Sequence, residues 1–147
     1  MRRFGSPPSP YRTYRERPGA YAVIAGTDGI LVTEETSTNV EIQLPGGGID
    51  PGETPIMALH REALEETGQR IRVERRLGVY QRYTYMPDYD LWARTICHVF
   101  LCRPGLTLGK PTERHHRALW MSPAEAVVQL ASPGDAWFVR EVLAGRL

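Results

Sequence analysis

The stretch from residue 45 to residue 71 constrains this chain most, because it joins a glycine-rich loop to a helix. The loop reads PGGGIDPGE, and its glycines allow sharp turns and close approach of the backbone to a ligand. Thr54 is a suitable N-cap, Pro55 fits the first helical position, and Gly68 suits a left-handed C-cap. Between them, apolar residues recur at helical spacing at Ile56, Leu59 and Ala63.

The opposite face of this predicted helix is acidic. Glu62, Glu65 and Glu66 lie at positions i, i+3 and i+4, so their carboxylates converge. Each exposed like-charge pair costs about 0.2–0.5 kcal/mol, and the helix dipole also disfavours anions near the last turn. Mg²⁺ prefers oxygen ligands and would neutralise the cluster. From these residues alone, a solvated acidic face is the alternative interpretation.

The wider spacing favours the metal site. Gly47 is followed after five residues by Glu53, and after seven more by REALEETG over residues 61–68. This pattern resembles the Nudix box of the MutT-like Nudix hydrolase family, G-x5-E-x7-R-E-U-x-E-E-x-G-U, where U is a bulky aliphatic residue. Every fixed glycine and charged position is present. Ala63 and Gln69 depart from the pattern at two U positions.

The resemblance implies a fold and an activity. The fold is an α/β/α sandwich with a mixed β-sheet, in which the box forms a loop-helix-loop; pattern alone indicates only a mixed α/β or α+β domain. The activity is metal-dependent hydrolysis of a diphosphate linkage in a nucleoside diphosphate joined to another group. Nothing in the residues chooses between Mg²⁺ and Mn²⁺.

The resemblance also assigns roles within the box. Glu62 and Glu66 correspond to direct metal ligands, and Glu65 to a ligand or to the group that orients a bound water. The backbone carbonyl of Gly46 often completes the metal shell in relatives. An ion pair between Arg61 and Glu53 would tie the loop to the helix and hold the carboxylates still.

The general base is assigned less directly. In some relatives it is a box glutamate, and in others it lies on a later loop, a setting that Glu113 in the segment PTERHH resembles. An ordinary exposed loop glutamate is the alternative. His115 and His116 are either solvated or in contact with phosphate.

Aromatic residues are candidates for nucleotide recognition, because bases stack on aromatic faces. The selected residues are Tyr83, Tyr85 and Trp92, with Tyr80 and Tyr89 nearby. Tyr85 lies sixteen residues after Gln69, near the place of a tyrosine in relatives that cleave dinucleoside polyphosphates. Pro87 is an imperfect match to the proline of ADP-ribose relatives. An oxidised nucleoside triphosphate, ADP-ribose and a dinucleoside polyphosphate all stay open as substrates.

The rest of the chain reads as strands followed by helices. Strands are predicted at residues 20–24, 30–33, 40–44, 70–77, 79–85, 92–102 and 117–121, with a bulge or break at Gly78 and a loop over residues 103–111. Ser122 and Ser132 each precede a proline and predict the starts of two further helices. The second ends near Gly145.

Residues 1–19 are predicted to form a basic, proline-rich arm with five arginines and one glutamate, and the resemblance implies a single Nudix hydrolase domain over residues 20–147. The favoured interpretation is a partly ordered arm; the alternative is an arm that pairs with a sheet edge or a second subunit and brings arginines toward a phosphate. Because relatives are often dimers, a homodimer is an open alternative.

Composition limits the classes of partner that we expect for this chain. The net charge of +1 disfavours nucleic acid as a partner, and no apolar run approaches the ~20 residues that cross a bilayer. No apolar stretch of a secretory signal follows the basic start, which predicts a cytoplasmic protein with a nucleotide as its small-molecule substrate. Cys97 and Cys102 are predicted to be buried reduced thiols on opposite faces of one strand.

Two competing functions follow from the same residues. A nucleotide-sensing module with a Nudix fold would bind without turnover, but such modules usually lose box carboxylates that are all present here. An oligonucleotide-binding protein would need a broader basic face. The enzyme is therefore the favoured hypothesis.

Overall fold

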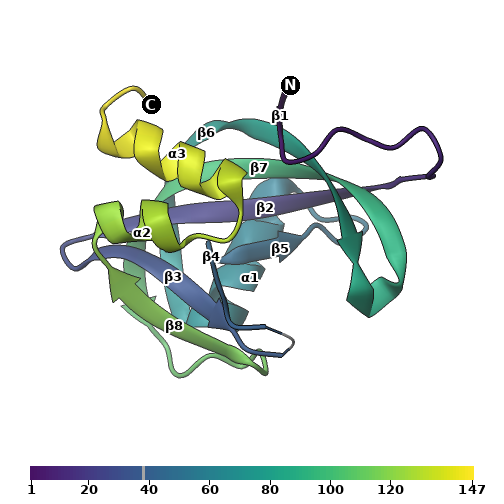
Figure 1. The fold of residues 1–147 in the computed structure, drawn as a ribbon. Coiled ribbons are helices and arrows are strands. Elements are labelled where there is room, and N and C mark those ends of the chain that lie inside the picture. Colours follow the sequence, from purple (N-terminus) through teal and green to yellow (C-terminus); the bar gives the residue numbers. More distant parts are fainter. Residues whose placement is uncertain (38) are drawn as a thin grey trace.

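The computed structural model describes residues 1–37 and 39–147, and its centre is one curved β-sheet (Figure 1). The strands are β1 (Arg2–Phe4), β2 (Arg15–Gly26), β3 (Gly29–Glu35), β4 (Glu41–Gln43), β5 (Gly46–Gly48), β6 (Gln69–Met86), β7 (Leu91–Thr107) and β8 (His116–Met121). The α-helices are α1 (Pro55–Thr67), α2 (Pro123–Gln129) and α3 (Pro133–Leu143), and a 3-10 turn, η1, spans Pro87–Tyr89.

The sheet is mixed. Its strand order is β1-β6-β7-β2-β3-β4, with β5 and β8 paired to β2 and β3 respectively. β1 runs parallel to β6 and β2 runs parallel to β7, whereas the other pairings are antiparallel. β2 and β3 form a hairpin that closes at Gly26 and Gly29, and β6 and β7 form a long hairpin.

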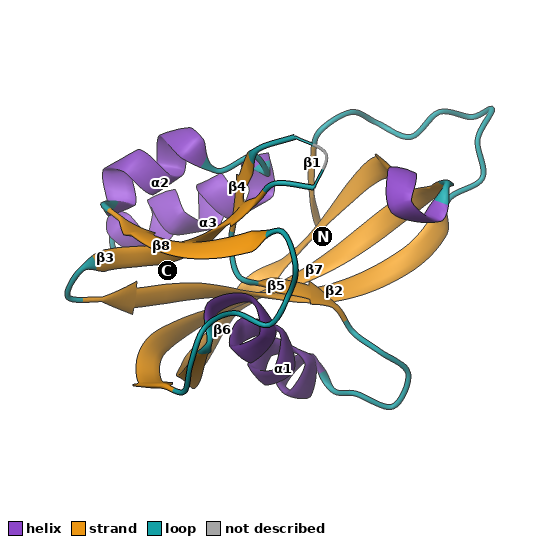
Figure 2. Cartoon of the chain, turned by 90° about the horizontal axis from the view of Figure 1, so that it is seen from below, coloured by secondary structure: helices purple, strands orange, loops and turns teal. Residues whose placement is uncertain are grey.

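Helices cover both faces of the sheet, as Figure 2 shows with α1 on one side and α2 and α3 on the other. Two buried clusters correspond to these layers. One joins α1 to the sheet through Leu59, Ala63 and Ile24, and the other joins α2 and α3 to it through residues such as Phe138 and Val99. The predicted α/β/α sandwich with a mixed sheet is confirmed.

The caps predicted for α1 are present. The side chain of Thr54 accepts a hydrogen bond from the Met57 N–H at 3.1 Å, and Gly68 adopts a left-handed φ of 72° while its N–H donates to the Leu64 carbonyl. A Cβ on Gly68 would lie 2.1 Å from the Gly109 carbonyl oxygen, so this position needs glycine for space as well as conformation. Ile56 differs from the predicted apolar stripe, because it is 45% exposed.

Two predicted boundaries are wrong. Residues 103–107 continue β7 instead of starting a loop, and Pro104 is tolerated because it faces only β6 there; the pairing of β7 with β2 ends at Cys102. The predicted strands before and after Gly78 are one strand, β6, with a register shift between Arg76 and Gly78. That shift confirms the irregularity expected at Gly78.

The first residues pack on the domain. Arg2–Phe4 pair with Tyr80–Arg82 of β6, and the Phe4 ring meets the Tyr80 ring edge-on with 5.3 Å between centroids. The Arg2 guanidinium lies 4.3 Å from the Trp137 ring centroid. Residues 2–4 thus pair with a sheet edge, as in the alternative interpretation of the arm. β2 also begins at Arg15, so the predicted boundary after residue 19 falls inside a strand.

The two cysteines agree with their prediction. Both are buried and free, and Cys97 and Cys102 belong to the clusters on opposite faces of the sheet. Burial is the main reason that their pKa values are raised, to about 11 and about 12. In residues 1–37 and 39–147, no helix combines the length and apolar character needed to cross a membrane.

A buried polar network ties α3 to β6. The Tyr80 hydroxyl donates to Asp135 Oδ1 at 2.7 Å and lies 2.9 Å from Ser132 Oγ, the capping group of α3. Asp135 is 3% exposed, and burial raises the pKa of its carboxyl to about 6 against hydrogen bonds that lower it.

We expect Asp135→Asn to change the pH dependence of stability. The folded-state pKa of about 6 exceeds the ordinary 3.8, so the folded protein holds this proton more tightly and loses stability as the pH rises toward 6. Asparagine keeps an acceptor for Tyr80 but does not titrate. Between pH 4 and pH 7, the free energy of unfolding of the wild type should fall by up to about 3 kcal/mol relative to the variant. Urea unfolding at each pH measures this, and parallel curves would contradict it.

Candidate active site

The box opens into a cavity with a volume of about 740 Å³. The glycines of β5 and the acidic face of α1 form one wall, the end of β6 with η1 forms the second, and the segment before β8 forms the third. The cavity therefore brings together segments far apart in the sequence, including Gly46, Glu62, Glu66, Tyr85, Glu113 and His116.

Glu66 is the most deeply placed of the box carboxylates. It is 4% exposed, and its Oε2 accepts a hydrogen bond from the Gly46 N–H at 3.0 Å. Burial, with smaller contributions from Glu62 and Glu113, raises the pKa of Glu66 to about 9 despite that hydrogen bond. Burial likewise raises the pKa of Glu62. The surroundings therefore disfavour the charged forms of Glu62 and Glu66, which a nearby cation would stabilise.

Arg61 connects the helix to the loop. Its Nε and Nη2 donate to the two Glu53 oxygens, each at 2.8 Å, so the expected Arg61–Glu53 ion pair is present and bidentate. Nη2 also donates to the Gly48 carbonyl at 3.0 Å, while Nη1 lies 3.0 Å from Glu62 Oε1 and 3.4 Å from Glu65 Oε2. These hydrogen bonds lower the pKa of Glu53 to about 2. One guanidinium thus fixes both the loop and the carboxylates.

The segment that carries Glu113 is tied to the end of α1. The N–H groups of Thr112 and Glu113 donate to the Glu65 carbonyl at 2.8 and 2.9 Å. Glu113 is exposed and lines the cavity, and its charge contributes to the raised pKa values of Glu62 and Glu66. The structure therefore brings Glu113 beside the box.

The two histidines differ. His115 is exposed, has a left-handed φ of 65°, and its carbonyl accepts from the Thr36 N–H. His116 places Nε2 3.7 Å from Glu66 Oε1, and its buried Nδ1 has no partner in the part of the chain that the structure describes. His116 therefore belongs to the carboxylate cluster, and His115 to the rim of the cavity.

Only one of the three aromatic candidates lines the cavity. Tyr85 lines the cavity, and its hydroxyl donates to Asp90. Tyr83 and Trp92 do not line it; their rings pack against Tyr14, at centroid distances of 4.8 and 6.2 Å. Alternation places Tyr83 and Tyr85 together on the face of β6 opposite Arg82 and Thr84, so Tyr85 lines the cavity from the end of the strand, beside η1.

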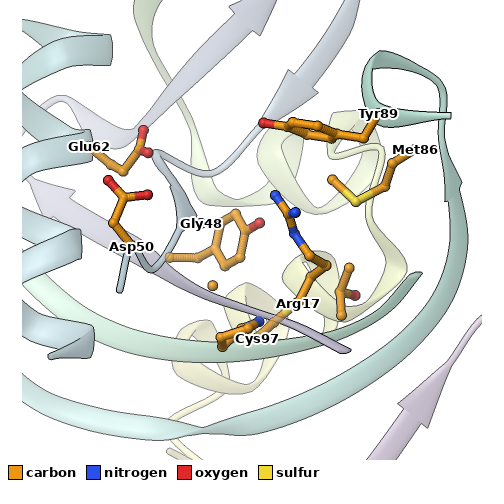
Figure 3. Close-up of a pocket in the computed structure, with 11 residues that line it drawn as sticks. Arg17, Gly48, Asp50, Glu62, Met86, Tyr89 and Cys97 are labelled. Carbon is orange, nitrogen blue, oxygen red and sulfur yellow. The ribbon is translucent and has the colours of Figure 1, made fainter. Parts of the chain in front are cut away.

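No role was predicted from the sequence for several cavity residues. Arg82, Thr84 and Met86 occupy alternate positions of β6, a pattern visible once the inward face is known. Arg17 and Tyr89 line a smaller pocket next to Glu62 (Figure 3). The parallel pairing of β2 with β7 helps to place Arg17, and nothing local in the sequence predicts that pairing.

The donor atoms suit a hard divalent cation. Carboxylate oxygens from consecutive turns of one helix face a glycine-rich backbone, and oxygen ligands are those that Mg²⁺ and Mn²⁺ prefer. Among the described residues, no three such side chains are already gathered as a ligand set. Arg61 and the Gly46 N–H hold Glu62 and Glu66 instead, so a cation would compete with these contacts.

A family comparison agrees with the box and the fold: the family description "NUDIX domain" matches residues 15–143. The chain belongs to the NUDIX domain family. A MutT-like protein of Streptomyces ambofaciens is 29% identical over 109 residues, covering 74% of this NUDIX chain and 66% of that protein. An RNA pyrophosphohydrolase of Helicobacter pylori (strain G27) is 44% identical over 57 residues, covering 35% of this chain and 37% of that protein.

The fold of this NUDIX chain is also that of a solved relative. A NUDIX hydrolase from Nitrosomonas europaea superposes with a TM-score of 0.75 at 24% identity, covering 90% of this chain and 91% of that one. The chain thus spans two thirds or less of the two curated relatives, at 66% and 37% of their lengths, and nearly all of this solved structure. The resemblance stated from the box is confirmed.

We expect Glu53→Gln to weaken metal binding without touching a proposed ligand. Loss of the bidentate ion pair frees Arg61, and loss of such supporting contacts typically costs about 10–100-fold in metal affinity. Titration of Mn²⁺, followed by electron paramagnetic resonance of the free ion, measures the change. Glu74→Gln is the matched control, since Glu74 pairs with Arg72 and Arg103 away from the cavity. Equal Mn²⁺ affinity in both variants and wild type would contradict the role of Glu53.

Proposed function

We propose that this NUDIX protein hydrolyses a diphosphate linkage in a nucleotide with the help of a divalent cation. One observation carries the proposal: the box carboxylates open into a cavity of about 740 Å³, within the roughly 300–1,000 Å³ typical of small-molecule sites. A ligand bound in that cavity would place its phosphates beside the acidic face of α1.

The cation would be held by Glu62, Glu65, Glu66 and the Gly46 carbonyl. When bound, Mg²⁺ or Mn²⁺ would neutralise the phosphate oxygens and make a bound water a better nucleophile. The two metals have the same ligand preferences at this site, so either fits the proposal.

The chain's own residues would position and deprotonate water. A water molecule adds to one phosphorus, the bond from that phosphorus to the bridging oxygen breaks, and two phosphate-containing products leave. Glu113 is our candidate to accept the proton of the water, because its segment is anchored on the Glu65 carbonyl beside the box. Glu53 and Arg61 would keep loop and helix in register throughout.

The nucleotide itself would contact the far walls of the cavity. Tyr85 is our candidate for direct contact, because it lines the cavity. Trp92 and Tyr83 would support it indirectly: the Trp92 and Tyr85 rings are 5.2 Å apart, and Tyr83 packs in the same aromatic group through Tyr14. The name of the Helicobacter relative adds a 5′-triphosphate RNA end to the substrates worth testing.

Hydrolysis of a nucleotide panel tests the proposal. The panel contains dNTPs, oxidised dGTP, ADP-ribose, dinucleoside polyphosphates and a 5′-triphosphate oligoribonucleotide, each with Mg²⁺, Mn²⁺ or EDTA. We expect metal-dependent turnover of one class, reduced more than about 100-fold in Glu66→Gln, since a direct ligand should matter at least as much as a supporting residue. Glu125→Gln, on exposed surface of α2, is the control. Nucleotide binding without turnover of any substrate would favour the sensing module.

Glu113→Gln separates the general base from the metal ligands. General base catalysis typically contributes 10²–10⁴-fold, so kcat should fall by about that factor while KM changes little. Steady-state kinetics on the substrate found with the panel measure both constants. An unchanged kcat would indicate that Glu113 is an ordinary loop residue and that the general base is a glutamate of the box.

A further inference from the structure

A second, smaller pocket lies beside the box carboxylates. Its volume is about 180 Å³, and it shares Tyr21, Gly48, Glu62, Met86 and Tyr89 with the large cavity. Figure 3 shows the Arg17 side chain directed into this pocket, beneath the Tyr89 ring. The pocket is therefore a side compartment of the proposed active site.

Arg17 has no acidic partner among the described residues, and the cavity residues Arg82 and Arg114 have none there either. Arg61 and Arg94 make ion pairs, whereas no carboxylate lies within ion-pair distance of Arg17 in residues 1–37 and 39–147. Arg17 is nevertheless half-buried. A guanidinium withdrawn from water without a counter-charge is prepared for an anionic ligand.

Tyr89 leaves the hydrogen-bond donors of Arg17 free. The guanidinium carbon lies 4.6 Å from the centroid of the Tyr89 ring, an arrangement that stacks the ring on the cation. Stacking uses the face of the guanidinium, while its N–H groups radiate from the edge. The ring therefore holds the cation in place and leaves its donors for oxygen atoms.

The tip of the β6–β7 hairpin fixes that ring. Tyr89 is the last residue of η1, and the next residue, Asp90, adopts a left-handed φ of 46° with its N–H bonded to the Pro87 carbonyl. The Tyr85 hydroxyl donates to the Asp90 carboxylate. Two contacts therefore support the turn that carries Tyr89, although the ring itself is 58% exposed.

The two sides of the pocket have opposite charge. Arg17 is on one side, and Asp50 and Glu62 are on the other (Figure 3). A free anion would be repelled by the carboxylates, and a free cation would be repelled by the guanidinium. A phosphate bound to a divalent cation satisfies both sides, with the metal toward Glu62 and the phosphate oxygens toward Arg17.

Size favours a phosphate over a nucleoside in this compartment. A volume of about 180 Å³ lies below the roughly 300–1,000 Å³ of pockets for whole small molecules, while the adjoining cavity of about 740 Å³ lies within it. The small pocket therefore suits one end of the phosphate chain, and the large cavity suits the rest of the nucleotide.

We propose that Arg17 binds a phosphate group of the nucleotide and that Tyr89 is the positioning residue that holds Arg17 for it. This proposal rests on the proposed function in one respect, the identity of the ligand as a metal-bound diphosphate. It adds a phosphate-binding group contributed by β2, outside the box.

Binding of methylenediphosphonate in excess Mg²⁺ tests the proposal, because its P–C–P bridge cannot be hydrolysed and it carries no base. Isothermal titration calorimetry should show affinity reduced about 10–100-fold in Arg17→Ala, as expected for losing a charge-assisted hydrogen-bond pair. The affinity of Arg17→Lys should lie between those of the wild type and Arg17→Ala, because lysine keeps the charge but lacks the planar guanidinium. Arg15→Ala, an exposed arginine two positions earlier on β2, is the control and should bind like wild type.

Tyr89 variants test positioning separately. Tyr89→Ala should weaken methylenediphosphonate binding about 2–5-fold, and Tyr89→Phe should restore wild-type affinity because it keeps the aromatic face. On a substrate, Tyr89→Ala should raise KM more than it lowers kcat. Equal weakening in the Phe and Ala variants would overturn the stacking role.

The two proposals fail in different ways. Wild-type affinity in both Arg17→Ala and Arg17→Lys, with thermal melting that shows folded protein, would overturn the phosphate site even if the protein hydrolyses nucleotides. Absence of turnover on every substrate, with Arg17-dependent binding of methylenediphosphonate, would overturn the proposed hydrolysis and support the phosphate site. An Arg15→Ala variant as weak as Arg17→Ala would overturn the site in favour of a general charge effect.

Discussion

The bidentate pair between Arg61 and Glu53 is the contact on which the site depends. Glu62, Glu65 and Glu66 repel one another, and a helix selected only for stability would not place them on adjacent turns. Arg61 lies between this cluster and the loop, with 2.8 Å contacts to Glu53 and a 3.0 Å contact to Glu62. The same guanidinium therefore offsets repulsion and fixes the loop, so the geometry of the carboxylates and the path of the backbone opposite them are set together.

Glycine residues allow the loop backbone to approach α1 and β2 closely. A Cβ on Gly47 would lie 2.7 Å from Glu62 Oε1, and one on Gly46 would lie 2.2 Å from the Ala20 carbonyl oxygen. The loop is thus pressed between α1 and β2, where side chains would separate the helix from the sheet. Because β5 also pairs with β2, the glycine-rich segment is part of the sheet and not a free loop. The carboxylates consequently face a backbone whose position the core determines.

Local spacing predicts the box well, because a helix, its caps and an ion pair eight residues apart depend on neighbours in the sequence. Thr54 and Gly68 lie where the spacing predicts, and the Arg61–Glu53 pair is the one that the resemblance implies. Long-range pairing is different. The parallel pairings of β1 with β6 and of β2 with β7 join segments about 80 residues apart, and only packing of the whole sheet selects them. The sequence therefore left the pairing of the arm with a sheet edge as an alternative only. Tyr83, Tyr85 and Trp92 share one face of the β6–β7 hairpin, so alternation does not separate them, and of the three only Tyr85, at the end of β6 beside η1, lines the cavity.

In the proposed function, the charges of the site are balanced only when both the cation and the phosphate are bound. Burial raises the pKa values of Glu62 and Glu66, because the protein alone accommodates their negative charge poorly. Arg17 is half-buried, and no carboxylate lies within ion-pair distance of it in the described residues. A cation alone would neutralise the carboxylates but repel Arg17. A phosphate alone would pair with Arg17 but be repelled by the carboxylates. A metal–phosphate pair relieves both, so each component should raise the affinity for the other by the same factor. The same arrangement favours a transition state over a ground state wherever negative charge increases on the phosphate oxygens between the two sides.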